Sequence, residues 1–259
     1  MPLALRFDGL GQYRSVMRLT VLGCSGSYPG HDCPCSGYLV QQDGTNVLVD
    51  LGPGCLSNLQ RHLRLDEVTA VVLSHSHADH WSDLAGLHVA SRYRFERVGI
   101  PVFGTAETHE IAQLIPGNLS PTFDWTVTGD GDEFAIGPLR FAMERTDHYV
   151  ETLAMRIESS AGGSIVYSAD TGPDWSIEHL GRGVDLALVE ATYGTDEEAE
   201  GMKHLSARQA GAMARAAGAK RCVLTHFWPE SDLSVHAING ESAYGAAVAL
   251  ASPHERYEL

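Results

Sequence analysis

The sequence contains no apolar run that approaches the ~20 residues needed for a membrane-spanning helix. Near its N-terminus it carries Arg6 and Asp8, where a secretory signal requires an unbroken apolar stretch. Basic residues are scarce as well: 18 Lys and Arg stand against 33 Asp and Glu, for a formal net charge of -15. Such a charge opposes non-specific attraction to nucleic acid or to an anionic membrane. We therefore predict a cytoplasmic protein with no membrane partner and a poor fit to tRNA.

Cysteines are few and lack regular spacing. The sequence has five, which are Cys24, Cys33, Cys35, Cys55 and Cys222. They do not form the paired C-x-x-C spacing of a structural zinc site, so they are expected to be reduced thiols. The segment Cys33-Pro34-Cys35 is a weak metal signal, because no second pair of thiols accompanies it.

The 259 residues, 44% of them hydrophobic, suffice for one substantial layered core. We expect a single domain over residues 1–259, with residues 1–17 as an N-terminal extension. Strands are predicted at 18–22, 37–41, 46–50, 70–73, 101–103, 139–144, 153–158, 164–168, 186–189 and 222–224. Helices are predicted at 56–63 and 207–217, and a tight hairpin turn at Asp43-Gly44. Acidic residues or histidines follow several strands, where ligand sites form in layered α/β folds.

The segment from Ser74 to His80 carries the strongest functional signal. Four side chains that can bind metal, those of His75, His77, Asp79 and His80, lie within six residues, directly after the predicted strand 70–73. Neutral imidazoles and a carboxylate suit zinc and its neighbours. Imidazoles two residues apart can chelate one ion and leave Asp79 and His80 to face a second. A histidine-rich surface patch is the alternative, and the internal position of the motif argues against it.

This pattern, H-x-H-x-D-H after a strand, resembles the signature of the metallo-β-lactamase superfamily. The other motifs follow in the order of that family, namely Thr146-Asp147-His148, Ser168-Ala169-Asp170-Thr171-Gly172 and Leu224-Thr225-His226. The resemblance implies an α/β fold, the αββα sandwich of two mixed β-sheets flanked by helices. It also implies two divalent metal ions, with zinc favoured and manganese or iron suited to the same ligands. The implied ligands are His75, His77 and His148 for one ion, Asp79, His80 and His226 for the other, and Asp170 as the bridge.

Two further motifs resemble those of the ribonuclease Z-like phosphodiesterases. These are Glu190-Ala191-Thr192, after a predicted strand, and His204-Leu205-Ser206, before a predicted helix. In that branch a glutamate orients a histidine that protonates or stabilises the departing oxygen. A carboxylate bonded to one imidazole nitrogen fixes the tautomer and keeps the ring cationic for acid catalysis. Val189 and Leu205 replace a histidine and a serine that are frequent there, which weakens the match to the tRNA-processing members. His204 as a plain surface residue is the alternative.

The resemblance implies a hydrolase in which Asp79, Glu190 and His204 are catalytic. Water activated between two cations would attack phosphorus, with Asp79 orienting the water and His204 serving the leaving alcohol. The tRNA-cleaving relatives carry a long arm between the third metal histidine and the bridging aspartate. Here only 170 − 148 = 22 positions separate His148 from Asp170, enough for two strands and a turn. We predict a phosphodiesterase for a small phosphodiester, most similar to bacterial enzymes that cleave 3′,5′-cyclic nucleotides.

Other functions remain open. A ribonuclease Z-type tRNA 3′-processing endonuclease is the first alternative. A lactonase or thioesterase would use the same metals but would leave Glu190 and His204 without a role. A non-enzymatic, metal-stabilised binding protein is disfavoured because all seven ligands are present. A homodimer is suggested by analogy alone.

Aromatic and acidic residues beside the motifs add two weaker expectations. Trp81, Tyr193 and Trp228 lie next to ligand motifs, where they would either stack a base or simply pack. The acidic run at residues 196–200 is expected to be a solvated loop, with the rim of a pocket as its alternative place.

Overall fold

The structure is a computed structural model that describes residues 16–115 and 117–259. Most of the predicted N-terminal extension, residues 1–15, therefore lies outside the described residues. Met17, at the end of that predicted extension, is buried in the core. Within the described ranges, no helix has both the length and the apolar character required to cross a bilayer.

Two seven-stranded sheets form the centre of the molecule. The first sheet has the order β14-β1-β2-β3-β4-β5-β6. Its strands are β1 (Arg18–Gly23), β2 (Gly37–Gln42), β3 (Thr45–Leu51), β4 (Ala70–Val72), β5 (Ile100–Gly104), β6 (Phe123–Val127) and β14 (Arg256–Glu258). Pairing is antiparallel from β14 to β3 and parallel from β3 to β6, so the sheet is mixed.

The second sheet repeats this arrangement in reverse chain order, as β13-β12-β11-β10-β9-β8-β7. Its strands are β7 (Glu133–Ile136), β8 (Leu139–Arg145), β9 (Leu153–Ser159), β10 (Ser164–Tyr167), β11 (Leu186–Glu190), β12 (Cys222–Thr225) and β13 (Ala249–Leu250). Its pairs are antiparallel from β7 to β10 and parallel from β10 to β13.

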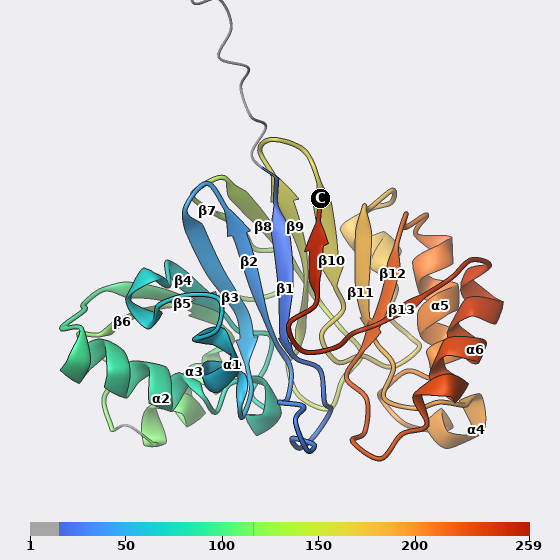
Figure 1. Cartoon of the computed structure of the whole chain (residues 1–259), viewed down its shortest axis with the longest axis horizontal. Helices are drawn as coiled ribbons and strands as arrows, with labels where there is room; N and C mark the ends of the chain where they lie inside the picture. Colours follow the sequence, from blue (N-terminus) through green and yellow to red (C-terminus); the bar gives the residue numbers. More distant parts are fainter. Residues whose placement is uncertain (1–15, 116) are drawn as a thin grey trace, which may run out of the picture.

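Helices flank the two sheets on their outer sides. They are α1 (Cys55–Leu59), α2 (Leu84–Val89), α3 (Ala106–Leu114), α4 (Asp196–Ala199), α5 (Ala207–Ala216) and α6 (Leu233–Tyr244). Figure 1 shows α1 to α3 at one side of the molecule and α5 and α6 at the opposite side, with the strands between them. This is the predicted αββα sandwich, and the fold class is confirmed.

The layers are held together by alternation along the strands. Val47 and Val49 of β3 belong to the cluster between the two sheets, whereas Leu48 belongs to the cluster beneath α1 and α2. Successive side chains of a strand point to opposite faces, so a strand covered on both sides must be apolar at every position. A third buried cluster joins the outer face of the second sheet to α5. The near-continuous apolar strands follow from this four-layer arrangement.

Local signals in the sequence account for the hairpin and for α5. Gln42 pairs with Thr45, and Asp43 and Gly44 both have positive φ, at 49° and 78°, as a two-residue turn requires. Helix α5 begins at a capping box, in which the Ser206 side chain accepts from the backbone N–H of Gln209 and the Gln209 side chain bonds back. The predicted helix 207–217 is therefore confirmed to within one residue.

The predicted helix 56–63 was too long. Helix α1 ends at Leu59, and the next hydrogen bonds, from Arg61 N to Asn58 O and from His62 N to Leu59 O, are the tighter three-residue type. The chain must become extended at Arg64, which caps a short 3-10 helix at Leu65–Glu67. The space before β4 therefore permits fewer α-helical residues than the apolar pattern suggests.

Candidate active site

The loops that follow β4, β8, β10 and β12 converge at one place between the two sheets. They bring all seven predicted metal ligands together in two groups, and a third group, formed by Asp170, His204 and His226, overlaps them. The first group holds His75, His77, His148 and Asp170, and the second holds Asp79, His80 and His226. Within each group the ligand atoms lie within 4.8 Å of one another. These His and Asp clusters are suited to binding metal ions.

Asp170 faces both groups. Its Oδ2 lies 3.7 Å from Nε2 of His75 and 3.8 Å from Nε2 of His148. Its Oδ1 lies 3.3 Å from Nε2 of His80 and 3.4 Å from Nε2 of His226. This Oδ1 is buried, and among the described residues it has no hydrogen-bond donor in good geometry. An orphaned carboxylate oxygen is costly in a protein interior, so the arrangement fits a cation at each oxygen.

Hydrogen bonds at the other ring nitrogen orient most of the histidines. Nδ1 of His75 lies 2.9 Å from Ser74 Oγ, and Nδ1 of His80 lies 2.7 Å from Asp50 Oδ2. Nδ1 of His148 lies 3.0 Å from the carbonyl oxygen of Lys203, and Nδ1 of His226 lies 2.9 Å from Thr192 Oγ1. In His80 and His148 that nitrogen must donate to an oxygen acceptor, which leaves the Nε2 lone pair free to face the centre. His77 instead presents Nδ1, 3.1 Å from His75 Nε2 and 3.2 Å from His148 Nε2.

The electrostatics of the centre also fit bound cations. Burial lowers the pKa of His75, His77 and His148, which favours the neutral imidazole that metal ligation needs. Burial has the same tendency at His80, but the carboxylates around it, first Asp170, raise its pKa well above the ordinary value. With every ligand histidine neutral, the buried carboxylates would have no positive charge beside them, and divalent ions would balance their charge. Such ligands suit zinc, manganese and iron alike.

Asp50 supports the second group, and the sequence analysis missed it. It is the last residue but one of β3 and is fully buried, with φ of 53°. Its carboxylate accepts hydrogen bonds from the Ser74 backbone N–H and hydroxyl, the Tyr167 hydroxyl and His80 Nδ1, all at 2.7 to 2.8 Å. A carboxylate that closes an apolar strand was the only available signal, because no metal motif includes this position.

We expect Asp50→Asn to weaken metal binding at the second group by roughly 10–100-fold, the usual cost of losing an outer partner of a ligand histidine. The amide would present a donor to the Nδ1 proton of His80 and so disturb the ring that this carboxylate orients. Titration of apo protein with zinc measures the effect. Asp185→Asn removes the same charge from a surface pair with Lys220 and should bind as the parent does. Equal affinities in both variants would contradict the orienting role.

Asp79 is held by the connection between β1 and β2. Its Oδ2 accepts from the backbone N–H of Ser27 at 2.8 Å and lies 3.4 Å from His226 Nε2. Ser27 has a φ of 62°, so the loop adopts a strained turn at the point where it reaches the carboxylate. The backbone of this loop is therefore part of the support of the site.

Glu190 and His204 form the predicted pair. Oε1 of the buried Glu190 lies 2.8 Å from His204 Nδ1 and also accepts from the Thr171 N–H, while Oε2 accepts from the backbone N–H groups of Thr192 and Leu205. Burial lowers the pKa of His204, but the Glu190 carboxylate outweighs it and raises that pKa to about 9. The His204 ring stacks on His226 with centroids 5.6 Å apart, so the pair borders the metal centre.

Thr192 links this pair to the second metal group, and it too was missed as a site residue. Its Oγ1 lies 2.7 Å from Glu190 Oε2 and 2.9 Å from His226 Nδ1. The hydroxyl can donate to the carboxylate and accept from the imidazole at the same time. Glu190 therefore orients both His204 and, through Thr192, His226. The sequence signal was present in Glu190-Ala191-Thr192, where only the glutamate received a role.

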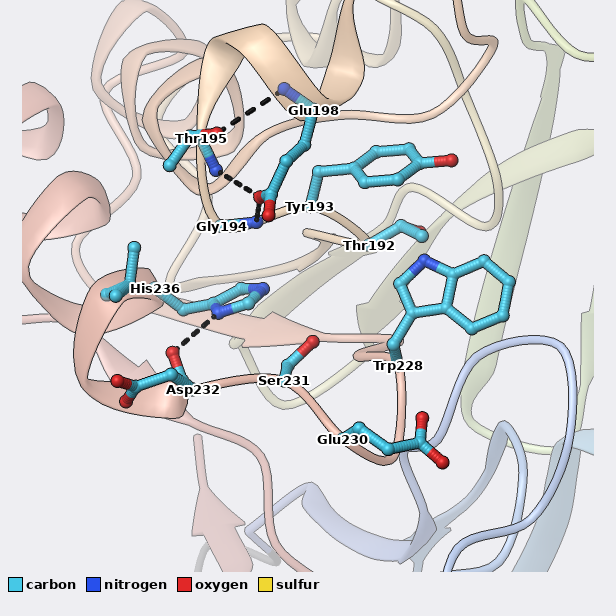
Figure 2. Close-up of a pocket in the computed structure, with 11 residues that line it drawn as sticks. Thr192, Tyr193, Gly194, Thr195, Glu198, Trp228, Glu230, Ser231, Asp232 and His236 are labelled. Carbon is cyan, nitrogen blue, oxygen red and sulfur yellow. Dashed lines mark hydrogen bonds between the residues drawn. The ribbon is translucent and has the colours of Figure 1, made fainter.

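A cavity of about 660 Å³ adjoins the centre at Thr192. Its lining includes Tyr193, Trp228 and His236, and Figure 2 shows the two aromatic rings on one side and His236 on the other. Trp81 takes no part, because it is 3% exposed and donates from Nε1 to Ser76 O inside the core. Of the three aromatics singled out in the sequence, Trp81 packs and the other two line this cavity.

The acidic run at 196–200 is mostly helical, so the expectation of a loop was wrong. Thr195 and Glu198 form a capping box, and the first turn of α4 is acidic. Carboxylates near a helix N-terminus are stabilised by the free backbone N–H groups and by the helix dipole. Glu198 also accepts from the Gly194 N–H and lines the cavity, so the alternative place at a pocket rim describes this residue.

Known proteins resemble this chain along most of its length. Residues 45–227 match the family described as "Beta-lactamase superfamily domain". An uncharacterized protein of Mycobacterium tuberculosis is 38% identical over 234 residues, which cover 86% of this chain and 85% of that protein. The probable metallo-hydrolase YhfI of Bacillus subtilis is 31% identical over 216 residues, covering 81% of this chain and 86% of YhfI.

A ribonuclease Z of Kineococcus radiotolerans is 30% identical over 269 aligned positions, which cover 82% of this chain and 84% of that enzyme. The crystal structure of YhfI superposes with a TM-score of 0.87 at 26% identity and covers 95% of this chain and 100% of YhfI. The family match at residues 45–227 includes all seven predicted metal ligands.

Proposed function

The chain belongs to the beta-lactamase superfamily as a metallo-hydrolase of the ribonuclease Z-like branch, and from that premise we propose that it hydrolyses 3′,5′-cyclic nucleotides to nucleoside monophosphates. The observation that carries the proposal is the hydrogen bond of 2.8 Å between Glu190 and His204, beside the metal centre. Hydrolysis of a phosphodiester expels an alkoxide, which needs a proton donor. A cationic histidine held by a buried glutamate is such a donor.

In this proposal each residue of the site has a separate role. Two divalent ions held by the seven ligands would supply positive charge for the phosphate and acidify a water molecule. Asp79, fixed by the Ser27 N–H, aligns the attacking water. Glu190 holds His204 Nδ1, so Nε2 is the nitrogen that delivers a proton to the departing oxygen. The Thr192 hydroxyl contacts both Glu190 and His226 and so fixes their positions relative to one another.

The cavity beside the centre supports a small substrate. Tyr193 and Trp228 present aromatic faces on which a nucleobase can stack. Glu198, Glu230 and Asp232 also line it, and their charges oppose any second phosphate. A cyclic mononucleotide has a single phosphate, which stays at the metals while its base enters the cavity. A polynucleotide would bring further phosphates toward the carboxylates.

The short connection between His148 and Asp170 gives a second argument for a small substrate. All of its residues are described, and they form β9, a turn at Gly162 and Gly163, and β10. The long arm implied for tRNA-cleaving relatives has no place there. The specific observation that favours a ribonuclease Z activity is the similarity to the enzyme of Kineococcus radiotolerans, so tRNA 3′-processing is the second candidate.

A substrate panel tests the proposal. Metal-replete protein should hydrolyse 3′,5′-cyclic nucleotides with a kcat/KM at least ~10²-fold above that for precursor tRNA, because tRNA binding rests on cationic contacts to phosphates that this acidic chain offers poorly. Linear dinucleotides and an acyl lactone complete the panel. Efficient tRNA maturation with cyclic nucleotides untouched would establish the second candidate instead. Turnover of the lactone alone would remove the phosphodiesterase assignment.

A further inference from the structure

Two cysteine thiols meet in the connection between β1 and β2. Sγ of Cys24 and Sγ of Cys33 lie 3.5 Å apart, although nine positions separate the residues in the sequence. Both cysteines are free, and neither belongs to a metal group. The mechanism proposed above does not use them, so their contact requires its own explanation.

The two thiols are held differently. Cys24 is buried directly after β1, and its Sγ lies 3.2 Å from the carbonyl oxygen of Ala251. Cys33 closes a tight turn with Gly30, through hydrogen bonds from Gly30 N to Cys33 O and from Cys33 N to Gly30 O. The tip of that turn is Asp32, whose side chain is 89% exposed. A disulfide needs an S–S distance of ~2.05 Å, so the two sulfurs must approach by roughly 1.5 Å, with the exposed turn at Cys33 the freer of the two partners.

The pair is also chemically asymmetric. The hydrogen bond from Cys24 lowers the pKa of Cys33 to about 6, whereas the same contact and burial raise the pKa of Cys24 well above its ordinary value. Cys33 is partly exposed and lines two cavities of about 500 and 510 Å³, which a small oxidant can enter. An accessible thiolate next to a buried thiol is the arrangement of an attacking and a resolving cysteine.

We propose that Cys24 and Cys33 form a peroxide-responsive dithiol that closes to an intramolecular disulfide. The Cys33 thiolate sulfur attacks one oxygen of hydrogen peroxide, the O–O bond breaks, and the hydroxide that leaves takes up the proton that Cys33 released to solvent on ionising and becomes water, so that Cys33 becomes a sulfenic acid. The Cys24 sulfur then attacks the Cys33 sulfur, and the S–O bond breaks. The displaced hydroxide takes the Cys24 proton and leaves as water. Both thiols are oxidised, and one peroxide is reduced to two water molecules.

Formation of the disulfide acts on the loop between Cys24 and Cys33, which supports the metal centre. Ser27, which donates its backbone N–H to Asp79 Oδ2, lies between the two cysteines. Gly26 lies there too and packs so closely on the His226 ring that a Cβ would stand 2.7 Å from Nδ1. Movement of this loop therefore alters the support of two predicted ligands of the second group. We expect the oxidised protein to retain metal at that group less well than the reduced protein.

Peroxide treatment of the full chain tests the dithiol independently of any substrate. Reduced protein exposed to hydrogen peroxide, denatured and alkylated should lose two alkylatable thiols, and peptide mapping should find Cys24 linked to Cys33. Cys33→Ser should keep its Cys24 thiol, and Cys24→Ala should accumulate a Cys33 sulfenic acid that dimedone traps. Cys222→Ser, altered in the buried strand β12, serves as the matched control and should still form the disulfide.

Several results would overturn the proposal. One is that all five thiols remain alkylatable after peroxide treatment. Another is that a cross-link still forms in Cys33→Ser, and a third is that Cys33 becomes over-oxidised while the Cys24 thiol stays free. Metal analysis of the oxidised protein tests the coupling to the centre separately. Identical metal content in the oxidised and reduced forms would overturn that coupling while leaving the disulfide in place.

Discussion

Replacing Asp170 by alanine is expected to empty both metal groups at once and to abolish turnover. Protein purified without chelator should carry up to two transition-metal ions per chain, and the variant close to none. The reason is geometric, because Oδ2 faces His75 and His148 while Oδ1 faces His80 and His226. The loss should exceed the ~10–100-fold in affinity that removal of an outer partner causes. Elemental analysis and kcat/KM measure the two effects.

A variant of one group alone provides the control for Asp170. His77→Ala removes a ligand that belongs only to the first group, so it should lose one ion and retain the other. If Asp170→Ala behaved in the same way, the carboxylate would serve a single ion and the bridging role would be wrong. A metal-free preparation of the parent protein with full activity would contradict the metal assignment as a whole.

Replacing His204 by alanine should lower kcat by ~10²-fold or more and leave the metal content unchanged, in keeping with the usual contribution of an acid–base group. His204 contacts the rings of His148 and His226 and lies within ligand distance of Asp170 and His226, but it is not one of the seven predicted ligands. Its partner Glu190 should give a similar loss as Glu190→Gln, because the amide cannot stabilise an imidazolium. Steady-state kinetics with elemental analysis on the same samples separates catalysis from metal loss.

The leaving group provides the control for His204. A nitrophenyl phosphodiester expels a phenolate of low pKa that needs little protonation, so His204→Ala should lose much less activity on it than on a cyclic nucleotide. Equal losses on both substrates would point to a structural role for the ring. Depletion of metal in the variant would assign His204 to the ligands instead.

Local motifs selected the candidate ligands, and their resemblance to a known family predicted the fold class. The histidines two residues apart after β4 and the carboxylate after β10 lie next to buried strands that their composition identifies. The order of the motifs along the chain matched that of the family, and the sandwich was predicted from this resemblance. Turn and cap signals, such as Asp43-Gly44 and Ser206 with Gln209, acted within a few residues and were equally informative.

The residues that the sequence analysis missed are defined by contacts between distant segments. Asp50 meets His80 across 30 positions, Thr192 meets His226 across 34, and Ser27 meets Asp79 across 52. A carboxylate, a hydroxyl or a backbone N–H has no pattern that identifies it as the partner of a ligand. Only the packing of β3, β4, β11 and β12 places these groups within hydrogen-bond distance.

The sequence by itself determined the candidate chemistry of this protein: the seven predicted metal ligands, the predicted pair of Glu190 and His204, and the strands that present them. These features depend on residue type and on short-range spacing, both of which can be read directly from the sequence. The tertiary structure alone decided the orientation of each imidazole, the cavity that Tyr193, Trp228 and His236 line, the early end of α1, and the contact of Cys24 with Cys33. These features arise when the layers close, because hydrogen bonds and shape across the layers depend on three-dimensional distance rather than on position in the sequence.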